Sequence, residues 1–284
     1  MNVVEVEDRS TVRQESLQRA GPEKERGMRD IIQRLFSLDN AVALVTGSSG
    51  GIGLALARGL AEAGARVVVN GRDSGKVAAA VASMKSDGLL ADTAVFDVTD
   101  PERVERGVAS IEHEIGPIHV LVNNAGIQRR SPLEDFSPET WRELMRTNLD
   151  AVFYVGQAVA RRMILRGKGQ IINIASVQSE LARTNIAPYT ASKGAVKMLT
   201  KGMATDWGKH GLRANALAPG YFRTELNKAL VEEKFSTWLS ARTPLGRWGD
   251  VQELVGAAIF LASDASSFVN GHVLYVDGGV TACL

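Results

Sequence analysis

The sequence is poor in the features that mark several classes of protein. It holds a single cysteine, Cys283, so it can form no internal disulfide. Its histidines, four in number, are scattered and show no metal-ligand spacing. The formal net charge is only +1, which gives no electrostatic reason to expect binding to nucleic acid or to an anionic membrane. We therefore expect a metal-free reaction in a reducing cytoplasm.

Long apolar runs are also missing. No stretch stays apolar over the roughly 20 residues that a membrane-spanning helix needs. The start of the chain is dense in charge of both signs and has no apolar core of a secretory signal. What remains is an ordinary globular composition, 45% hydrophobic and 23% charged over 284 residues. That length suits one large α/β domain.

Residues 1–36 differ in composition from the rest of the chain. Their mixed charge predicts a flexible extension, either a disordered tail or a solvated helix. The apolar residues between Ile31 and Phe36 could instead form a short amphipathic turn that packs on the domain. A third alternative is that Met28 is the natural start. The composition does not choose among them, and we assign the catalytic domain to residues 37–284.

A glycine-rich turn follows the first apolar run. Residues 41–46 predict a strand buried on both faces, and Gly47, Gly51 and Gly53 come directly after it. A helical stretch and a second apolar run complete a βαβ unit. Glycines let the backbone approach a pyrophosphate closely, and the amino end of the helix offers N–H groups to the anion. The unit therefore predicts a dinucleotide site.

Strand and helix patterns alternate along the rest of the chain. We expect strands over residues 41–46, 65–70, 91–96, 118–122, 170–175, 213–218 and 272–276. We expect helices over residues 54–63, 74–87, 101–114, 138–166, 188–210, 224–241 and 251–262. This alternation predicts an α/β protein, a single Rossmann-type doubly wound domain with a seven-stranded parallel sheet. Ligands should bind beyond the carboxyl ends of the strands.

Three side chains could meet at one such end. Ser176 closes the apolar run that begins at Gln170, and Tyr189 and Lys193 stand four residues apart on one face of a predicted helix. A hydroxyl, a phenol and an ammonium suit proton transfer to a carbonyl oxygen, since the cation should lower the Tyr189 pKa from about 10. The simpler alternative is a surface tyrosine and a solvated lysine. The glycine-rich turn upstream favours the active site.

These motifs resemble those of the short-chain dehydrogenase/reductase family. TGSSGGIG resembles its glycine turn, NNAG its second signature, Y-x-x-x-K its active site, PG its nicotinamide-side loop and VDGG its usual chain end. The resemblance runs from about Leu38 to the carboxyl terminus in the family's order. It implies hydride transfer with a nicotinamide coenzyme.

The resemblance also implies roles for individual residues. Tyr189 would be the acid/base, Lys193 would hold the nicotinamide ribose, and Ser176 would bond the substrate oxygen. Asn148 would anchor a proton-relay water, or else be a polar helix residue that bonds the backbone. The expected coenzyme contacts are Gly47, Ser49, Gly51, Ile52, Gly53, Arg72, Asp97, Val98, Asn124, Ala125, Gly126, Tyr189, Lys193, Pro219, Gly220 and Thr224.

Some of these residues have a plain structural alternative. Asp97, in the motif FDVTD, resembles the family residue whose side chain contacts the adenine. Alternatively, Asp97 is only a residue of the turn that starts a helix. Asn123 should brace the sheet.

At the end of the second strand the small, uncharged Asn70 and Gly71 precede Arg72, where an NAD enzyme usually carries Asp or Glu. A guanidinium suits the 2′-phosphate of NADP. Gly50 weakens that prediction, because many NADP-using members have a basic residue there, so use of NAD(H) stays open.

Substrate choice rests on a narrower resemblance. The blocks NNAGIQRR, APGYFRTEL and ARTPLGRWGD resemble members that interconvert D-gluconate and 5-keto-D-gluconate. Either Arg129 or Arg130 could pair with the sugar-acid carboxylate, unless both are a solvated loop pair. Gln178, with Glu180 and Arg183 nearby, could bond sugar hydroxyls.

Other functions remain open at this stage. The chain could reduce a 3-oxoacyl group on acyl carrier protein, or another sugar or sugar acid. It could also be a nucleotide-binding scaffold without catalysis, although the intact Ser176, Tyr189 and Lys193 argue against that. Long helices beginning near Pro138 and Pro188 are rich in small and apolar residues, and the family resemblance implies a homotetramer built on them.

Overall fold

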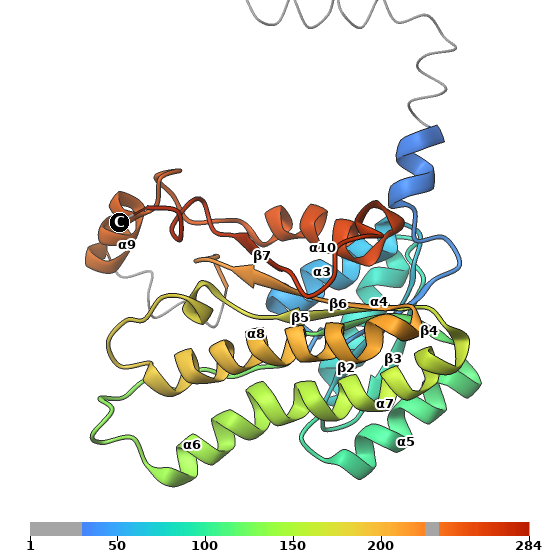
Figure 1. Ribbon diagram of the computed structural model, residues 1–284, viewed down its shortest axis with the longest axis horizontal. Helices are drawn as coiled ribbons and strands as arrows, with labels where there is room; N and C mark the ends of the chain where they lie inside the picture. The colour runs from blue at the N-terminus through green and yellow to red at the C-terminus, as the bar shows by residue number, and fades with distance from the viewer. Residues whose placement is uncertain (1–29, 225–232, 284) are drawn as a thin grey trace, which may run out of the picture.

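A parallel sheet forms the centre of the computed structural model, which describes residues 30–224 and 233–283 (Figure 1). Within this part of the chain the sheet has seven strands in the order β3-β2-β1-β4-β5-β6-β7. Every neighbouring pair is parallel, as the alternation of strands and helices predicted. The strands are β1 (Val42–Val45), β2 (Arg66–Gly71), β3 (Ala91–Val95), β4 (Ile118–Asn123), β5 (Gly169–Ile174), β6 (Leu212–Pro219) and β7 (Val273–Val276).

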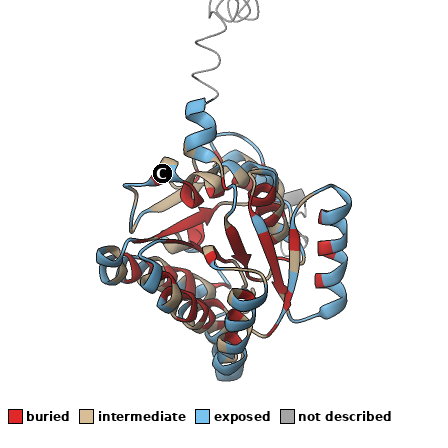
Figure 2. Cartoon of the chain, turned by 90° about the vertical axis from the view of Figure 1, so that its right-hand side faces the viewer, coloured by how far each residue is buried: buried red, intermediate tan, exposed pale blue. Residues whose placement is uncertain are grey.

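Helices cover both faces of the sheet. One core cluster packs α5 (Pro101–Glu114), α7 (Ala151–Arg166) and α8 (Ala187–Trp207) against it. The opposite cluster packs α3 (Gly51–Glu62), α4 (Ser74–Ser86) and α10 (Val255–Ala262). Figure 2 shows that most of the sheet and the inward faces of the helices are buried. β1 is buried along its whole length, which explains why the predicted run over residues 41–46 is continuously apolar rather than alternating.

Side-chain caps begin several of these helices. Asp100 accepts hydrogen bonds from the backbone of Glu102 and Arg103, at 3.0 and 3.1 Å, at the start of α5. Asp73 caps α4 through the backbone N–H of Lys76 at 3.0 Å. Each satisfies N–H groups that a helix start would otherwise leave unpaired.

The expected helix over residues 138–166 is interrupted. The chain forms α6 (Pro138–Met145), a π-helical turn η1 (Arg146–Asp150) and then α7. A π turn widens the helix by one residue and often lies at a functional site. Similarly, the expected helix over residues 251–262 begins as a 3₁₀ turn, η5 (Val251–Leu254). Of the helix expected over residues 224–241, the structure describes α9 (Glu233–Arg242), while residues 225–232 lie outside the described part.

Residues 30–36 form a short helix that projects from the domain in Figure 1. Ile31 and Ile32 are 51% and 54% exposed, so in the single chain the expected turn forms without burying its apolar side chains. The prediction for residues 1–29 falls outside the described part. None of the described helices is long and apolar enough to cross a membrane.

A chain of buried polar side chains links the middle of the sheet to α8. Asn123 donates from Nδ2 to Asn173 Oδ1 at 2.9 Å, and Asn173 Nδ2 donates to Thr200 Oγ1 at 3.0 Å. Buried amides need such partners, because an unpaired one costs about 1–3 kcal/mol. Asn123 therefore braces the sheet as predicted.

Candidate active site

A cavity of about 480 Å³ opens at the carboxyl ends of the strands. It lies at β1 and β4, where the strand order reverses: β2 and β3 follow on one side of β1, and β5 to β7 follow on the far side of β4. Ligands usually bind at this point in such sheets. The predicted site residues that line it are Gly47, Ser49, Gly51, Ile52, Gly53, Arg72, Asp97, Val98, Asn124, Ala125, Gly126, Arg130, Ser176, Gln178, Tyr189, Lys193, Pro219, Gly220 and Thr224. Two predicted residues, Arg129 and Asn148, are not among the lining residues.

The glycine turn between β1 and α3 leaves room for a ligand at the backbone. Gly47 and Gly51 adopt φ angles of +61° and +58°, which side chains disfavour. A Cβ on Gly53 would lie 2.4 Å from Asn124 Nδ2. Asn124 in turn donates from Nδ2 to Thr46 O at 2.9 Å, which holds the turn in place. No side chain caps the start of α3, so its first N–H groups can bind an anion.

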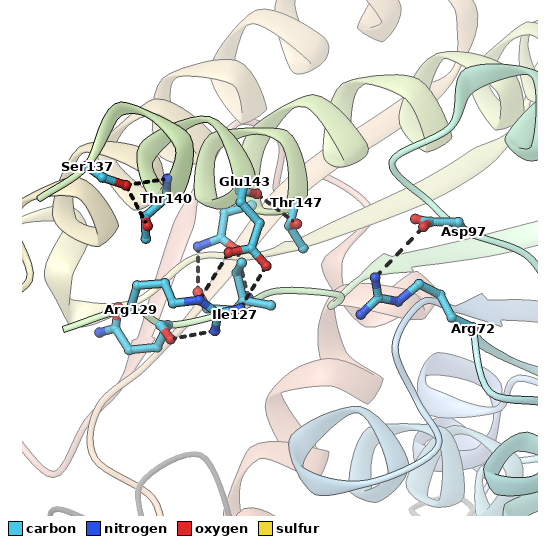
Figure 3. Close-up of polar contacts among 10 residues, drawn as sticks. Arg72, Asp97, Ile127, Arg129, Ser137, Thr140, Glu143 and Thr147 are labelled. Atoms are coloured by element: carbon cyan, nitrogen blue, oxygen red, sulfur yellow. Dashed lines mark hydrogen bonds and ion pairs between the residues drawn. The ribbon is translucent and has the colours of Figure 1, made fainter.

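The end of β2 carries a cation rather than an acid. Asn70 donates from Nδ2 to Ala94 O and Phe96 O, at 3.0 and 3.2 Å, so its side chain braces the strands. Arg72 lines the cavity with its side chain 73% exposed, and its Nη1 lies 3.8 Å from Asp97 Oδ2 (Figure 3). This geometry leaves the guanidinium free to meet a phosphate.

Asp97 serves the turn after β3. Its Oδ1 accepts from the backbone N–H of Thr99 at 2.9 Å and from Thr99 Oγ1 at 2.8 Å. Partial burial works to raise the pKa of this carboxyl, but the Thr99 hydrogen bonds and the Arg72 charge outweigh it, so the net pKa is lowered. Oδ1 is thus used by the turn, while Oδ2 faces Arg72 at the cavity.

Ser176, Tyr189 and Lys193 meet in the cavity as predicted. Ser176 ends the β5 segment, and its Oγ accepts from the backbone N–H of Gln178 at 3.1 Å in the 3₁₀ turn η2 (Val177–Ser179). Lys193 is 5% exposed and donates from Nζ to Ile174 O at 2.6 Å. Its Nζ lies 5.7 Å from the centre of the Tyr189 ring. A hydroxyl, a phenol and an ammonium therefore line the same cavity.

The expected lowering of the Tyr189 pKa is wrong. Burial raises the pKa of Tyr189 to about 12, only partly opposed by a hydrogen bond from Ser176. Burial also lowers the pKa of Lys193 to about 8. The reason is geometric, because the ammonium sits over the phenol ring and donates to Ile174 rather than to the phenolic oxygen. Tyr189 is therefore a protonated acid at neutral pH.

Asn148 does not line the cavity, but it bonds to Ile127, which does. It is fully buried in η1, where its Oδ1 accepts from Ile127 N at 2.8 Å and its Nδ2 donates to Ile127 O at 2.9 Å. Nδ2 also reaches Ser192 Oγ at 3.2 Å, in the helix that carries Tyr189. The side chain bonds the backbone, as the simpler alternative described, and ties the loop after β4 to α8.

The two adjacent arginines after β4 point to different places. Arg129 Nη2 and Nε contact Glu143 on α6 at 2.7 and 3.1 Å (Figure 3). Arg130 lines the cavity instead. Burial, and then the charge of Arg183, lower the pKa of Arg130. The structure thus brings one of the two candidate carboxylate readers to the site.

The wall beyond Ser176 contains further polar side chains. Arg183 and Tyr221 line the cavity, and Gln178 Nε2 donates to the Tyr221 hydroxyl at 3.3 Å. Tyr221 was not among the residues predicted from the sequence, although its place directly after Pro219-Gly220 was a signal. Glu180 points elsewhere, contacting Lys197 and accepting from the Tyr275 hydroxyl at 2.8 Å. The described residues contain no cluster of metal-ligating side chains.

Known proteins resemble the chain over most of its length. The profile of a family described as Enoyl-(Acyl carrier protein) reductase matches residues 47–281. Gluconate 5-dehydrogenase of Gluconobacter oxydans (strain 621H) is 65% identical, covering 88% of this chain and 98% of the relative. The 5-keto-D-gluconate 5-reductase of Escherichia coli (strain K12) is 52% identical, covering 87% and 97%.

A solved structure shares the fold closely. It is a gluconate 5-dehydrogenase from Burkholderia cenocepacia J2315 in complex with NADP and tartrate, 60% identical to this chain. The match covers 89% of this chain and 99% of that one, with a TM-score of 0.87. At this identity the arrangement of strands and helices described above is a shared one.

Proposed function

This chain belongs to the short-chain dehydrogenase/reductase family, and we propose that it acts within it as an NADP(H)-dependent gluconate 5-dehydrogenase. The reaction interconverts D-gluconate and 5-keto-D-gluconate. One observation carries the proposal: a single cavity joins the glycine turn and Arg72 at one end to Ser176, Tyr189 and Arg130 at the other. The names of the relatives, and the NADP and tartrate bound by the relative from Burkholderia cenocepacia, support it.

The residues present fit a phosphorylated dinucleotide. The uncapped start of α3 suits the pyrophosphate, and Arg72 suits a 2′-phosphate. Thr224 Oγ1 is buried at the cavity and has no hydrogen-bond partner among the described residues, so it is available to contact a ligand. When bound, NADPH supplies the hydride that the reduction needs.

The chain's own residues handle the proton and the developing charge. Tyr189, protonated at neutral pH, donates its phenolic proton to the carbonyl oxygen of the substrate. Ser176 stabilises the same oxygen as negative charge grows on it. Lys193 carries a positive charge below its lowered pKa of about 8 and stabilises the phenolate that remains. In the oxidation of gluconate the same groups act in reverse.

A direct assay tests the function. NADPH oxidation by the purified protein should be rapid with 5-keto-D-gluconate and slow with an acetoacetyl thioester, which a 3-oxoacyl reductase would prefer. The reverse order of rates would favour the acyl-carrier reductase. Tight NADPH binding without turnover of either compound would indicate a scaffold that has lost catalysis.

Arg72 should decide between the coenzymes. Replacing it with alanine should raise the KM for NADPH at least about tenfold relative to that for NADH, since a hydrogen bond to a charged group contributes roughly 1.5–3 kcal/mol. The matched control is Arg103→Ala, an exposed arginine of α5 that pairs with Asp100. Equal changes in the two KM values would show that Arg72 does not contact the 2′-phosphate.

We also propose a homotetramer working in the cytoplasm. Apolar side chains remain exposed on α7 and α8, with Phe153 at 43% and Met198 at 59%, and Phe268 is fully exposed before β7. Large apolar side chains left exposed in the single chain are typical of surfaces that contact another subunit. Light scattering at micromolar concentration should give about four times the mass of the chain, and a stable monomer would contradict the proposal. Cell fractionation tests the location.

A further inference from the structure

Two arginines from different segments meet at the substrate end of the cavity. Arg130 follows β4, and Arg183 lies between η2 and α8. Each lines the cavity, and they lie close enough for the charge of Arg183 to act on Arg130. In the described part of the chain neither has an acidic partner within ion-pair distance. By contrast, Arg129 is fully paired with Glu143. Two uncompensated cations beside the acid Tyr189 favour an anionic ligand.

The same wall has buried polar atoms without a partner. Arg183 Nε is buried and makes no hydrogen bond, and Gln178 Oε1 is buried and accepts none. Gln178 uses its other amide atom, Nε2, to bond the Tyr221 hydroxyl. Native structures rarely leave buried donors and acceptors unpaired unless a ligand or ion completes them. A ligand that satisfies both atoms offers an acceptor to Arg183 Nε and a donor to Gln178 Oε1.

The guanidinium of Arg183 is also held in place. Its Cζ lies 5.2 Å from the centre of the Phe235 ring on α9, a cation–π contact. Phe235 packs in turn against Tyr221 and Trp248, at ring distances of 5.8 and 6.3 Å. A fixed guanidinium loses little freedom when it binds a carboxylate.

We propose that Arg130 and Arg183 together bind the carboxylate of an aldonic acid, while Gln178 Oε1 accepts a hydrogen bond from one of its hydroxyl groups. The inference rests on the proposed function and extends it to the selection of acids over neutral sugars. A carboxylate offers acceptors to both guanidinium groups, and the carbon chain beside it carries the hydroxyl donors. The carbonyl at the far end of the same molecule then lies toward Tyr189 and Ser176.

The test compares molecules that differ only at the acid end. D-glucitol carries CH₂OH where D-gluconate has its carboxylate, and L-sorbose is in the same way the neutral counterpart of 5-keto-D-gluconate. Calorimetry measures binding of D-gluconate and D-glucitol to the wild type, Arg130→Met, Arg183→Met and Gln178→Leu. Methionine keeps much of the arginine stem and removes the charge. Arg142→Met, an exposed α6 arginine that pairs with Glu139, is the matched control.

Each arginine variant should bind D-gluconate about ten- to a hundredfold more weakly, as expected for loss of a charge-assisted hydrogen bond. Its binding of D-glucitol should change less than about threefold, and the control should change neither. Gln178→Leu should weaken the acid and the neutral sugar alike, by about three- to tenfold. Thermal melts of all variants check the fold.

Turnover separates this inference from the proposed function. If the wild type fails to reduce 5-keto-D-gluconate, the proposed function is wrong, while arginine-dependent binding of D-gluconate would still support the carboxylate site. If the wild type reduces it and both arginine variants keep its kcat/KM, the carboxylate site is wrong and the function stands. Equal losses of kcat/KM for 5-keto-D-gluconate and L-sorbose in the two arginine variants would also overturn the inference.

Discussion

Replacing Tyr189 with phenylalanine should lower kcat for the reduction of 5-keto-D-gluconate by about 10²–10⁴-fold or more. The variant loses only the phenolic oxygen, which holds the proton that the carbonyl receives. The phenyl ring keeps its place beside Lys193, whose Nζ lies 5.7 Å from the ring centre. Ser176 also keeps its hydrogen bond from the Gln178 backbone. The loss should therefore appear in kcat, whereas NADPH binding, followed by fluorescence, should change little.

Tyr154→Phe provides the matched control. Tyr154 lies on α7, outside the cavity, where its ring packs edge-on against Phe153 with centres 5.9 Å apart. Removal of this hydroxyl should leave kcat close to the wild-type value. A Tyr189→Phe protein with near-normal kcat would remove Tyr189 from the mechanism, and the search for the acid would turn to Tyr221.

Replacing Lys193 with methionine should lower kcat by about 10²-fold or more, because a preorganised charge beside the developing phenolate is lost. It should also change the pH profile. Burial lowers the pKa of Lys193 to about 8, so the wild-type ammonium is present below that pH and is lost above it. Tyr189, with a pKa of about 12, stays protonated throughout this range. The wild-type rate of reduction should therefore fall as the pH rises through about 8.

The Lys193→Met protein should be slow at every pH and should lack that fall. Lys201→Met, at an exposed position of the same helix, is the control and should keep the wild-type profile. The melting temperature should change little, since relief from burying an ammonium opposes loss of its hydrogen bond to Ile174. A Lys193→Met profile with the same decrease near pH 8 would assign that step to another group.

The sequence predicted the sheet and the cavity because both follow from local patterns. Seven predicted strands separated by helical stretches allow little besides a parallel sheet with helices on both faces. Glycines after β1 and the four-residue spacing of Tyr189 and Lys193 are visible without a structure. The positions of Ser176 and Asp97 at strand ends follow from the sheet. These residues therefore line the cavity as expected.

What the sequence did not predict depends on contacts between distant segments. The π turn that divides α6 from α7 accompanies the bonds from Asn148 to Ile127, which lies 21 residues earlier. The directions of Arg129 and Arg130 depend on Glu143, which pairs with the first and leaves the second at the cavity. The pKa of Tyr189 depends on burial and on where the Lys193 ammonium donates. None of these has a signature in spacing or composition.

The division of the cavity between separate segments has a consequence for how such a chain can change. The coenzyme end is built from the turns after β1, β2 and β3, whereas the wall proposed to bind the acid comes from Arg130 after β4 and from Gln178, Arg183 and Tyr221, with Phe235 beside Arg183. Substitutions confined to that wall can alter which carbonyl compound enters without moving the glycine turn or Arg72. A new substrate can thus be acquired in evolution, or by grafting one loop in the laboratory, while the inherited coenzyme and proton donor continue to work.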